Sequence, residues 1–73
     1  MFVNVAKLNG KIAERGMNKT QLAKLMRIDP STLYRKLSGD CGTLLVKDAI
    51  RIAEILELSA EECSEIFFAQ KVA

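Results

Sequence analysis

The connection between two short helical segments constrains this chain more than any other feature of its sequence. Residues 19–26 and 30–38 are both predicted to be helical, and only Arg27-Ile28-Asp29 separates them. Asp29 is a favoured N-cap residue, and Pro30 suits the first helical position because an N–H there has no partner within the helix. Three residues are too few for an antiparallel hairpin of helices, so we expect two helices that cross steeply, a helix-turn-helix.

The rest of the chain is also predicted to be helical, since it has no run of β-branched residues and is rich in Ala, Leu, Lys and Glu. Turn and cap signals separate five helices, at about residues 4–15, 19–26, 30–38, 45–57 and 60–69. Gly16 is expected to end the first helix, and capping boxes are expected at Asn18-x-x-Gln21 and Ser59-x-x-Glu62. We therefore expect a single all-α domain over residues 1–73.

Apolar residues at helical spacing identify the expected core. The positions predicted to face inward are Val5, Leu8, Ile12, Leu22, Ala23, Leu25, Met26, Leu33, Leu37, Val46, Ala49, Ile50, Ile52, Ala53 and Leu56. Ala23 is expected where the two crossing helices approach closely, and Ile28 at the corner between them. Gly10 interrupts the first helix, and we expect it to allow another backbone to come near.

The composition excludes several classes of protein. No apolar stretch approaches the roughly 20 residues of a transmembrane helix, and no basic region followed by an apolar run marks a signal peptide. The chain has no histidine, and Cys41 and Cys63 lack the spacing of a zinc site or a disulfide framework. We expect reduced thiols in a cytoplasmic protein that is not an enzyme and has no metal, cofactor, small-molecule ligand or membrane partner.

The charges divide between the two halves of the chain. Residues 1–40 contain eight Lys and Arg against three Asp and Glu, whereas residues 41–73 contain three against six. A basic half beside an acidic half is typical of a protein with one surface that binds a polyanion and one that does not. The alternative is that the helices simply carry solvated charges, which is what we expect of Lys7, Lys11 and Lys24.

Residues 19–39 resemble the helix-turn-helix of the lambda repressor and Cro superfamily, also called the XRE class. The matching residues are Ala23, Ile28, Thr32-Leu33 and Gly39. Nearly the whole chain fits the five-helix layout of those DNA-binding domains, and residues 31–39 and 65–69 resemble small phage and prophage regulators. The resemblance implies a sequence-specific transcriptional regulator of the phage repressor or Cro type, with residues 30–38 in the major groove of double-stranded DNA.

Three residues depart from the family pattern. Arg27 occupies a turn position that usually holds glycine, where φ is commonly positive. Pro30 replaces a residue that often reads bases, and Lys36 stands at a usually apolar position, so we expect the helix to lean on Leu37 instead. These departures keep a second function open: a helix-turn-helix module for protein interaction, of the anti-repressor or antitoxin type, that does not bind DNA.

The outward-facing residues of the motif are the candidate DNA contacts. We expect Arg35 to read guanine, because its guanidinium matches the O6 and N7 acceptors in the major groove; a phosphate contact is the alternative. The candidates for base or sugar contacts are Ser31, Thr32 and Tyr34, and those for phosphate contacts are Asn18, Lys19, Ser38 and Gly39.

The end of the chain is the candidate dimer contact. Phe68 points away from the apolar side of the fifth helix, and an exposed phenylalanine is unfavourable on a small monomer. We expect Phe68 and Val72 to form a two-fold contact, as the resemblance also implies for this region; closure of Phe68 over the core is the alternative. A homodimer would place two recognition helices about 34 Å apart and would match a palindromic operator.

Overall fold

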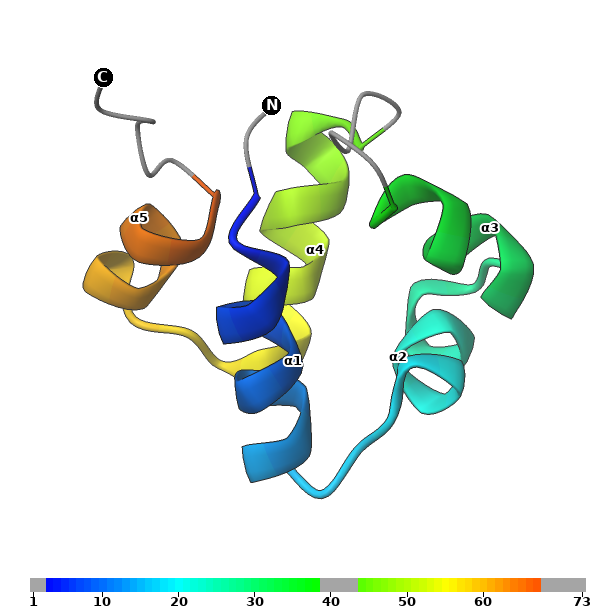
Figure 1. Cartoon of the computed structure of the whole chain (residues 1–73), viewed down its shortest axis with the longest axis horizontal. Helices are drawn as coiled ribbons and strands as arrows, with labels where there is room; N and C mark the ends of the chain where they lie inside the picture. Colours follow the sequence, from blue (N-terminus) through cyan, green and yellow to red (C-terminus); the bar gives the residue numbers. More distant parts are fainter. Residues whose placement is uncertain (1–2, 39–43, 68–73) are drawn as a thin grey trace.

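The computed structural model describes residues 3–38 and 44–67, and these residues form five helices (Figure 1). In chain order they are α1 (Val5–Glu14), α2 (Lys19–Met26), α3 (Pro30–Lys36), α4 (Val46–Leu56) and α5 (Ala60–Phe67). In Figure 1, α2 and α3 lie on one side of α1 and α4, and α5 lies on the other. The all-α fold is confirmed, and the described helix ends lie within two residues of their predicted positions, except that the end predicted for the fifth helix at about residue 69 lies outside the described residues.

The predicted capping boxes are present. Asn18 Oδ1 accepts a hydrogen bond from the Gln21 N–H at 2.8 Å, and the Asn18 N–H donates to Gln21 Oε1 at 3.0 Å. Ser59 and Glu62 form the same reciprocal pair before α5. These bonds satisfy amide groups that have no partner within the helix, which explains why α2 and α5 begin where they do.

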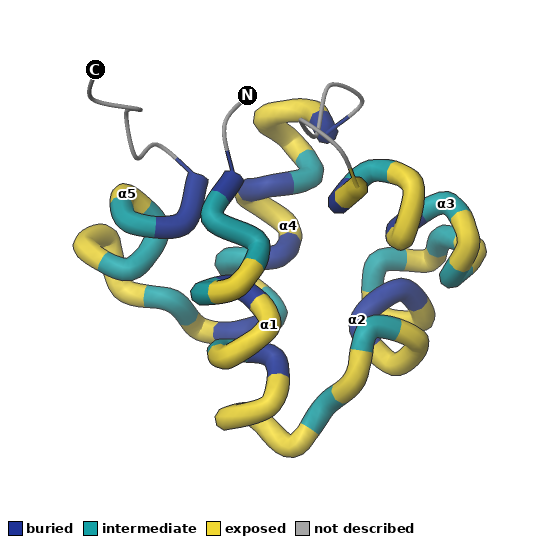
Figure 2. The backbone as a smooth tube through the Cα atoms, in the orientation of Figure 1, coloured by how far each residue is buried: buried dark blue, intermediate teal, exposed yellow. Residues whose placement is uncertain are grey.

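Residues from all five helices build the core, and Figure 2 shows their buried faces turned inward. The buried apolar residues are Val3, Leu8, Ile12, Leu22, Ala23, Leu33, Leu37, Leu44, Ala49, Ile52, Leu56, Ile66 and Phe67. Val5, Met17, Met26 and Ile28 are partly buried against them. The stripe predicted for α1 and the Leu33–Leu37 pair predicted for α3 are therefore confirmed.

Some predictions about burial are wrong. Leu25, Val46 and Ile50, predicted to face inward, are 50%, 56% and 55% exposed. In α4 the apolar pattern is wider than the part of the helix that its neighbours cover, so spacing alone assigned too many residues to the core. Gly10 is also not a point of close approach, because no described atom lies within 4 Å of the place where its Cβ would stand.

Two residues at helix ends adopt left-handed backbone conformations that matter for the motif. Gly16 has φ 69°, as expected of the glycine that ends α1. Arg27 has φ 60° and ψ 39° in the turn between α2 and α3, as expected from its place in the motif. A side chain at such a position costs roughly 1–2 kcal/mol, so the turn is strained.

We expect Arg27→Gly to raise the free energy of unfolding by up to about 1 kcal/mol. The change removes backbone strain of about 1–2 kcal/mol from the folded state. It also makes the unfolded chain more flexible, which costs roughly 0.5–1 kcal/mol of stability. Gly16→Ala is the matched opposite, since it places a side chain at positive φ, and it is expected to lower that free energy by about 1 kcal/mol or more. Urea denaturation measures both; a destabilised Arg27→Gly protein contradicts the prediction.

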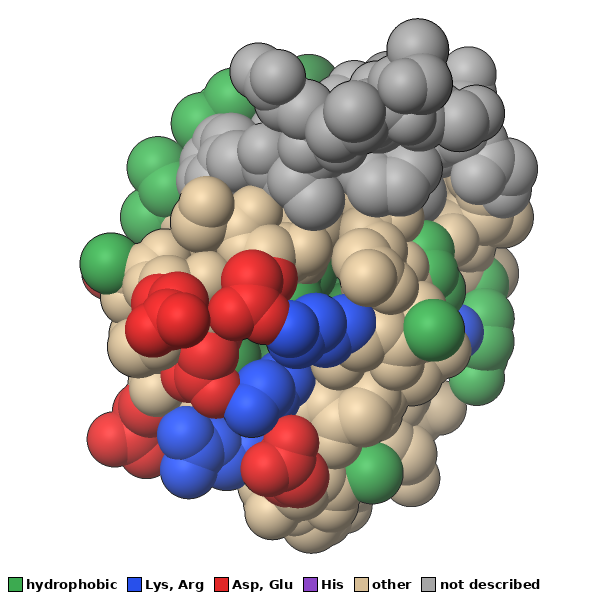
Figure 3. Space-filling model, turned by 60° about the vertical axis from the view of Figure 1, so that its left-hand side comes forward, with side chains coloured by type: hydrophobic (Ala, Val, Ile, Leu, Met, Phe, Trp, Pro, Cys, Tyr) green, Lys and Arg blue, Asp and Glu red, His purple; other side chains and the backbone are tan. Residues whose placement is uncertain are grey.

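Ion pairs join α1 to α5 on the face shown in Figure 3, where basic side chains contact acidic ones. Lys7 pairs with Glu65, and Lys11 pairs with Glu62 and, at 3.4 Å, with Glu14. The prediction that Lys7 and Lys11 are solvated charges is therefore wrong. Acidic residues of the second half of the chain neutralise basic residues of the first half, so these two lysines add little to any field that attracts a polyanion.

The Lys11 ammonium, together with the Ser59 N–H, lowers the pKa of Glu62 from 4.5 to about 2. Since the pKa in the folded state lies below the ordinary value, ionised Glu62 stabilises the fold above about pH 4.5, and this stabilisation is lost as the pH falls toward 2. We expect a carboxyl titration followed by NMR to place the midpoint of Glu62 well below 4.5, and Lys11→Met to move it upward. Lys24→Met is the control and should leave it unchanged.

Candidate nucleic-acid interface

The helix-turn-helix is formed by α2, the turn 27–29 and α3, as predicted. Ala23 of α2 is fully buried, so a larger side chain there would disturb the packing of α2 against its neighbours. The Ile28 N–H donates to the Ala23 carbonyl oxygen at 3.0 Å, and the Ile28 side chain packs against the core. These contacts fix the direction in which α3 leaves the turn.

One face of α3 is exposed over its whole length. Its residues follow the helical spacing i, i+3, i+4 and i+7, and they are Ser31, Tyr34, Arg35 and Ser38. Leu33 and Leu37, on the other side, are 0% and 4% exposed. Thr32 is half-buried at the edge of the exposed face. We call the four exposed residues the α3 face; their predicted exposure is confirmed.

Hydrogen bonds at both ends of α3 engage the two serines. Asp29 Oδ1 accepts from the Ser31 N–H at 2.9 Å and from the Ser31 hydroxyl at 2.6 Å. These two bonds, the hydroxyl first, hold the pKa of Asp29 below its usual range. The Ser38 hydroxyl donates to the Arg35 carbonyl oxygen at 2.9 Å. Each hydroxyl must therefore rotate out of its cap before it can donate to a ligand.

Lys19 and Tyr34 connect the start of α2 to the α3 face. The Lys19 ammonium lies 5.1 Å from the centroid of the Tyr34 ring, a cation–π contact that holds both side chains on one surface. Asn18 is exposed beside Lys19, and its side chain caps α2. Of the eight residues predicted to contact DNA, seven are described, and the Lys19–Tyr34 contact joins those of α2 to those of α3; Gly39 and the dimer residues Phe68 and Val72 lie outside the described residues.

Positive charge is concentrated on the motif. Residues 18–38 contain five Lys and Arg against one Asp. Within the described parts of the chain, Lys24, Arg27 and Arg35 are exposed and form no salt bridge. Lys24 and Arg27 were not among the predicted contacts. The sequence did contain a signal for them, because neither has an acidic residue three or four positions away that could pair with it along a helix.

Lys36 is a basic residue of the motif that turns to the core. Its Nζ lies 3.0 Å from Asp48 Oδ2 of α4, and Asp48 also accepts from the Leu45 N–H at 3.0 Å. Burial raises the pKa of Asp48, but the Leu45 N–H and the Lys36 ammonium together hold it below its usual value. Leu37 is buried as expected. The salt bridge to Asp48, which was not predicted, accommodates Lys36 at this position.

Neither a metal cluster nor a membrane-spanning helix is seen in the described residues. Among residues 3–38 and 44–67, no three His, Cys, Asp or Glu side chains come together in a way that could hold a metal ion. The same ranges contain no helix that is long and apolar enough to span a membrane. The α3 face is the candidate site because it is exposed and belongs to the basic motif.

Comparison with known proteins agrees with this geometry. The family model of the Cro/C1-type HTH DNA-binding domain matches residues 7–63, a range that begins within α1, contains the whole of α2, α3 and α4, and ends within α5. Comparisons with curated proteins and with solved structures give no significant match. The resemblance stated from the sequence is confirmed, and the chain belongs to the family of Cro/C1-type HTH DNA-binding domains.

Proposed function

We propose that this protein is a sequence-specific regulator of transcription, of the phage repressor or Cro type, that binds double-stranded DNA. The observation that carries the proposal is the exposed α3 face, on which Arg35 forms no salt bridge with any described residue, while Leu33 and Leu37 bury the other side of the helix. Helix α3 has seven residues, about 10 Å of helix. The major groove is about 12 Å wide and admits one helix.

Within this proposal, the α3 face reads the bases. Arg35 donates to O6 and N7 of a guanine, the strongest of the specific contacts available to it. Tyr34, 52% exposed, contacts the sugar–phosphate backbone or a thymine methyl group. Ser31 and Thr32, in the first turn of α3, contact bases or sugars with little preference.

Contacts to phosphates position the protein on the duplex. Asn18 and Lys19 lie at the start of α2, where amide groups and the helix dipole favour an anion. Ser38 and Gly39 follow α3 and form the proposed contact at its far end. The exposed cations Lys24 and Arg27 extend this surface along the end of α2 and the turn.

The proposed functional unit on DNA is a homodimer in the cytoplasm. Two copies related by a two-fold axis present two α3 faces, and the matching operator is palindromic, with half-sites about 34 Å apart. Phe68 and Val72 remain the contact proposed from the sequence.

Titration of duplex DNA at several salt concentrations tests this function. We expect an affinity that falls steeply with salt, by about 0.9 in log–log slope for each phosphate contact. Selection from a random DNA pool should then return a palindromic site. Binding that is absent at low salt would leave the second function, a protein-interaction module, as the better explanation.

A further inference from the structure

The first half of α4 carries an exposed apolar row. Val46 and Ile50 lie one turn apart and are 56% and 55% exposed, and Leu45 just before the helix is 49% exposed. These three make up most of the large apolar side chains that are exposed in the described residues; the other two, Leu25 and Tyr34, belong to α2 and α3. A cluster of this kind on a small protein is typical of an association surface.

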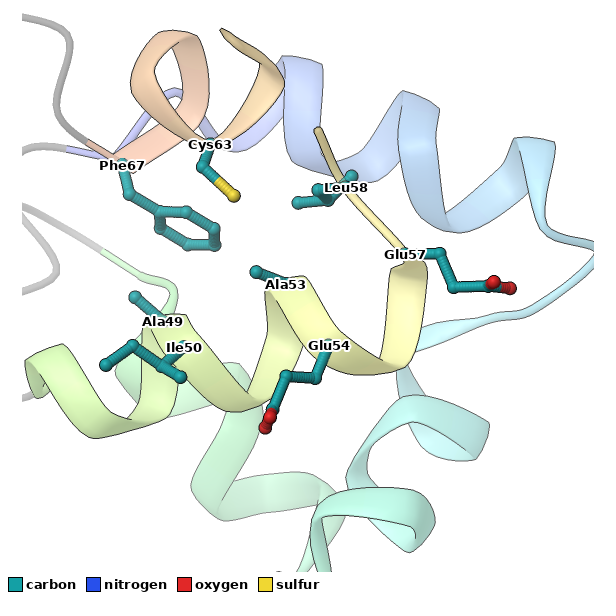
Figure 4. A pocket seen from close by; sticks show the side chains of 8 residues that line it. All are labelled: Ala49, Ile50, Ala53, Glu54, Glu57, Leu58, Cys63 and Phe67. Carbon is teal, nitrogen blue, oxygen red and sulfur yellow. The ribbon is translucent and has the colours of Figure 1, made fainter. Parts of the chain in front are cut away.

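A hollow of about 320 Å³ lies beside this row, between α4 and α5 (Figure 4). Its lining is mostly apolar: Ala49, Ile50, Ala53, Leu58, Cys63 and Phe67, with Glu54 and Glu57. In Figure 4, the side chains of Cys63 and Phe67 point from α5 toward α4. The short side chains of Ala49 and Ala53 leave room on the α4 side, so the hollow can receive an apolar side chain from another molecule.

Row and hollow lie on one surface, so this surface is complementary to a copy of itself, as a two-fold contact requires. Val46 projects from one end of the row, and the hollow begins one turn further on at Ala49 and Ile50. When two α4 helices pack antiparallel about an axis near Ile50, Val46 of each copy comes to lie over the hollow of the other.

The charges beside the row favour the same arrangement. Lys47 and Glu54 are both exposed and lie seven residues apart, which is two helical turns, so they stand on the same flank of the row. In an antiparallel pair centred near Ile50, Lys47 of each copy faces Glu54 of the other. A two-fold parallel pair would instead put these flanks on opposite sides of the interface, where Lys47 and Glu54 form no pair with their counterparts. The described residues thus provide two symmetric ion pairs for one orientation only.

We propose that a second copy of this chain docks on the α4 surface, defined as Val46, Ile50 and the hollow between α4 and α5, with the two α4 helices antiparallel. This inference rests on the proposed homodimer and gives it its main interface among the described residues, with the contact proposed for Phe68 and Val72 as an addition to it. The occupant is a second copy because the surface supplies both the projecting side chains and the hollow, and both signs of charge, in matching positions.

Sedimentation equilibrium without DNA tests the docking. The wild-type protein is expected to form dimers as its concentration rises, and Ile50→Glu is expected to remain monomeric. Ile50 is half-exposed in the single chain, so the variant should fold, which circular dichroism checks. Lys24→Glu, a charge change on α2, is the control and should dimerise like the wild type. A wild-type protein that stays monomeric at every concentration, or dimers that survive Ile50→Glu, would overturn the interface.

Exchange of charges tests the orientation. Lys47→Glu and Glu54→Lys should each raise the dimer dissociation constant about tenfold, because each turns two attractive pairs into repulsive ones. The double variant should recover an affinity near that of the wild type. A double variant as weak as the single ones contradicts the antiparallel arrangement. Salt-sensitive binding of monomeric Ile50→Glu to a DNA half-site separates these outcomes from a failure of the proposed function, since that binding depends on the helix-turn-helix and not on the α4 surface.

Discussion

Arg35→Ala is expected to weaken binding to the selected DNA site by about 10- to 100-fold per half-site, because a guanidinium paired with guanine is worth about 1–3 kcal/mol of base discrimination. The loss should be confined to sites that carry the guanine, so binding to unrelated duplexes should change much less. Arg35 is exposed and forms no salt bridge with the described residues, so the stability of the fold should hardly change. Fluorescence anisotropy with the selected duplex and a permuted one measures both affinities.

Lys24→Ala is the matched control for Arg35→Ala. Lys24 is also an exposed cation of the motif, but it lies on α2 and is proposed to contact only phosphates. Its removal should weaken binding to all sequences alike and reduce the log–log salt slope by about 0.9. If Arg35→Ala behaves in the same uniform way, then Arg35 binds a phosphate. If neither variant changes binding, the α3 face does not enter the groove.

Helix ends and the turn could be predicted from the sequence because the interactions that determine them are local. Asn18 and Gln21 are three residues apart, and each bonds to the backbone of the other, so the pair alone marks the start of α2. The left-handed conformation of Arg27 was implied by the family resemblance, in which this turn position usually holds glycine. The exposure of the α3 face could be predicted from the spacing of Leu33 and Leu37, because these two residues turn one side of the helix to the core and leave the other side to solvent.

What could not be predicted depends on residues far apart in the chain. Counting charges by halves could not show that Lys7 lies against Glu65, although this pairing removes positive charge from α1 and leaves it on α2 and α3. The Lys36–Asp48 pair likewise requires the relative placement of α3 and α4. The exposure of Ile50 depends on which side of α4 the rest of the fold covers, and the periodicity of α4 does not contain this information.

Leu33→Ala is expected to lower the free energy of unfolding by about 2–5 kcal/mol, since Leu33 is fully buried and its truncation leaves a cavity beneath α3. Domains are typically stable by about 5–15 kcal/mol, and a chain of 73 residues belongs near the lower end. Roughly 0–3 kcal/mol of stability then remains, so up to about half of the variant should be unfolded at 37 °C, and its apparent DNA affinity should fall in proportion to the folded fraction. Leu25→Ala is the matched control: the same truncation in the same motif, at a side chain that is 50% exposed, should cost about 1 kcal/mol or less.

The selected duplex distinguishes a folding defect from a binding defect. DNA at about 100 times its dissociation constant stabilises the folded state by about 2.7 kcal/mol, so it should raise the melting temperature of Leu33→Ala strongly, because that variant keeps every residue of the α3 face. Arg35→Ala should melt like the wild type without DNA and gain less from the same duplex concentration. Differential scanning fluorimetry with and without duplex measures all four values. If DNA fails to stabilise Leu33→Ala while it stabilises Leu25→Ala, then Leu33 does more than anchor α3, and the separation between the buried side of this helix and its exposed face is wrong.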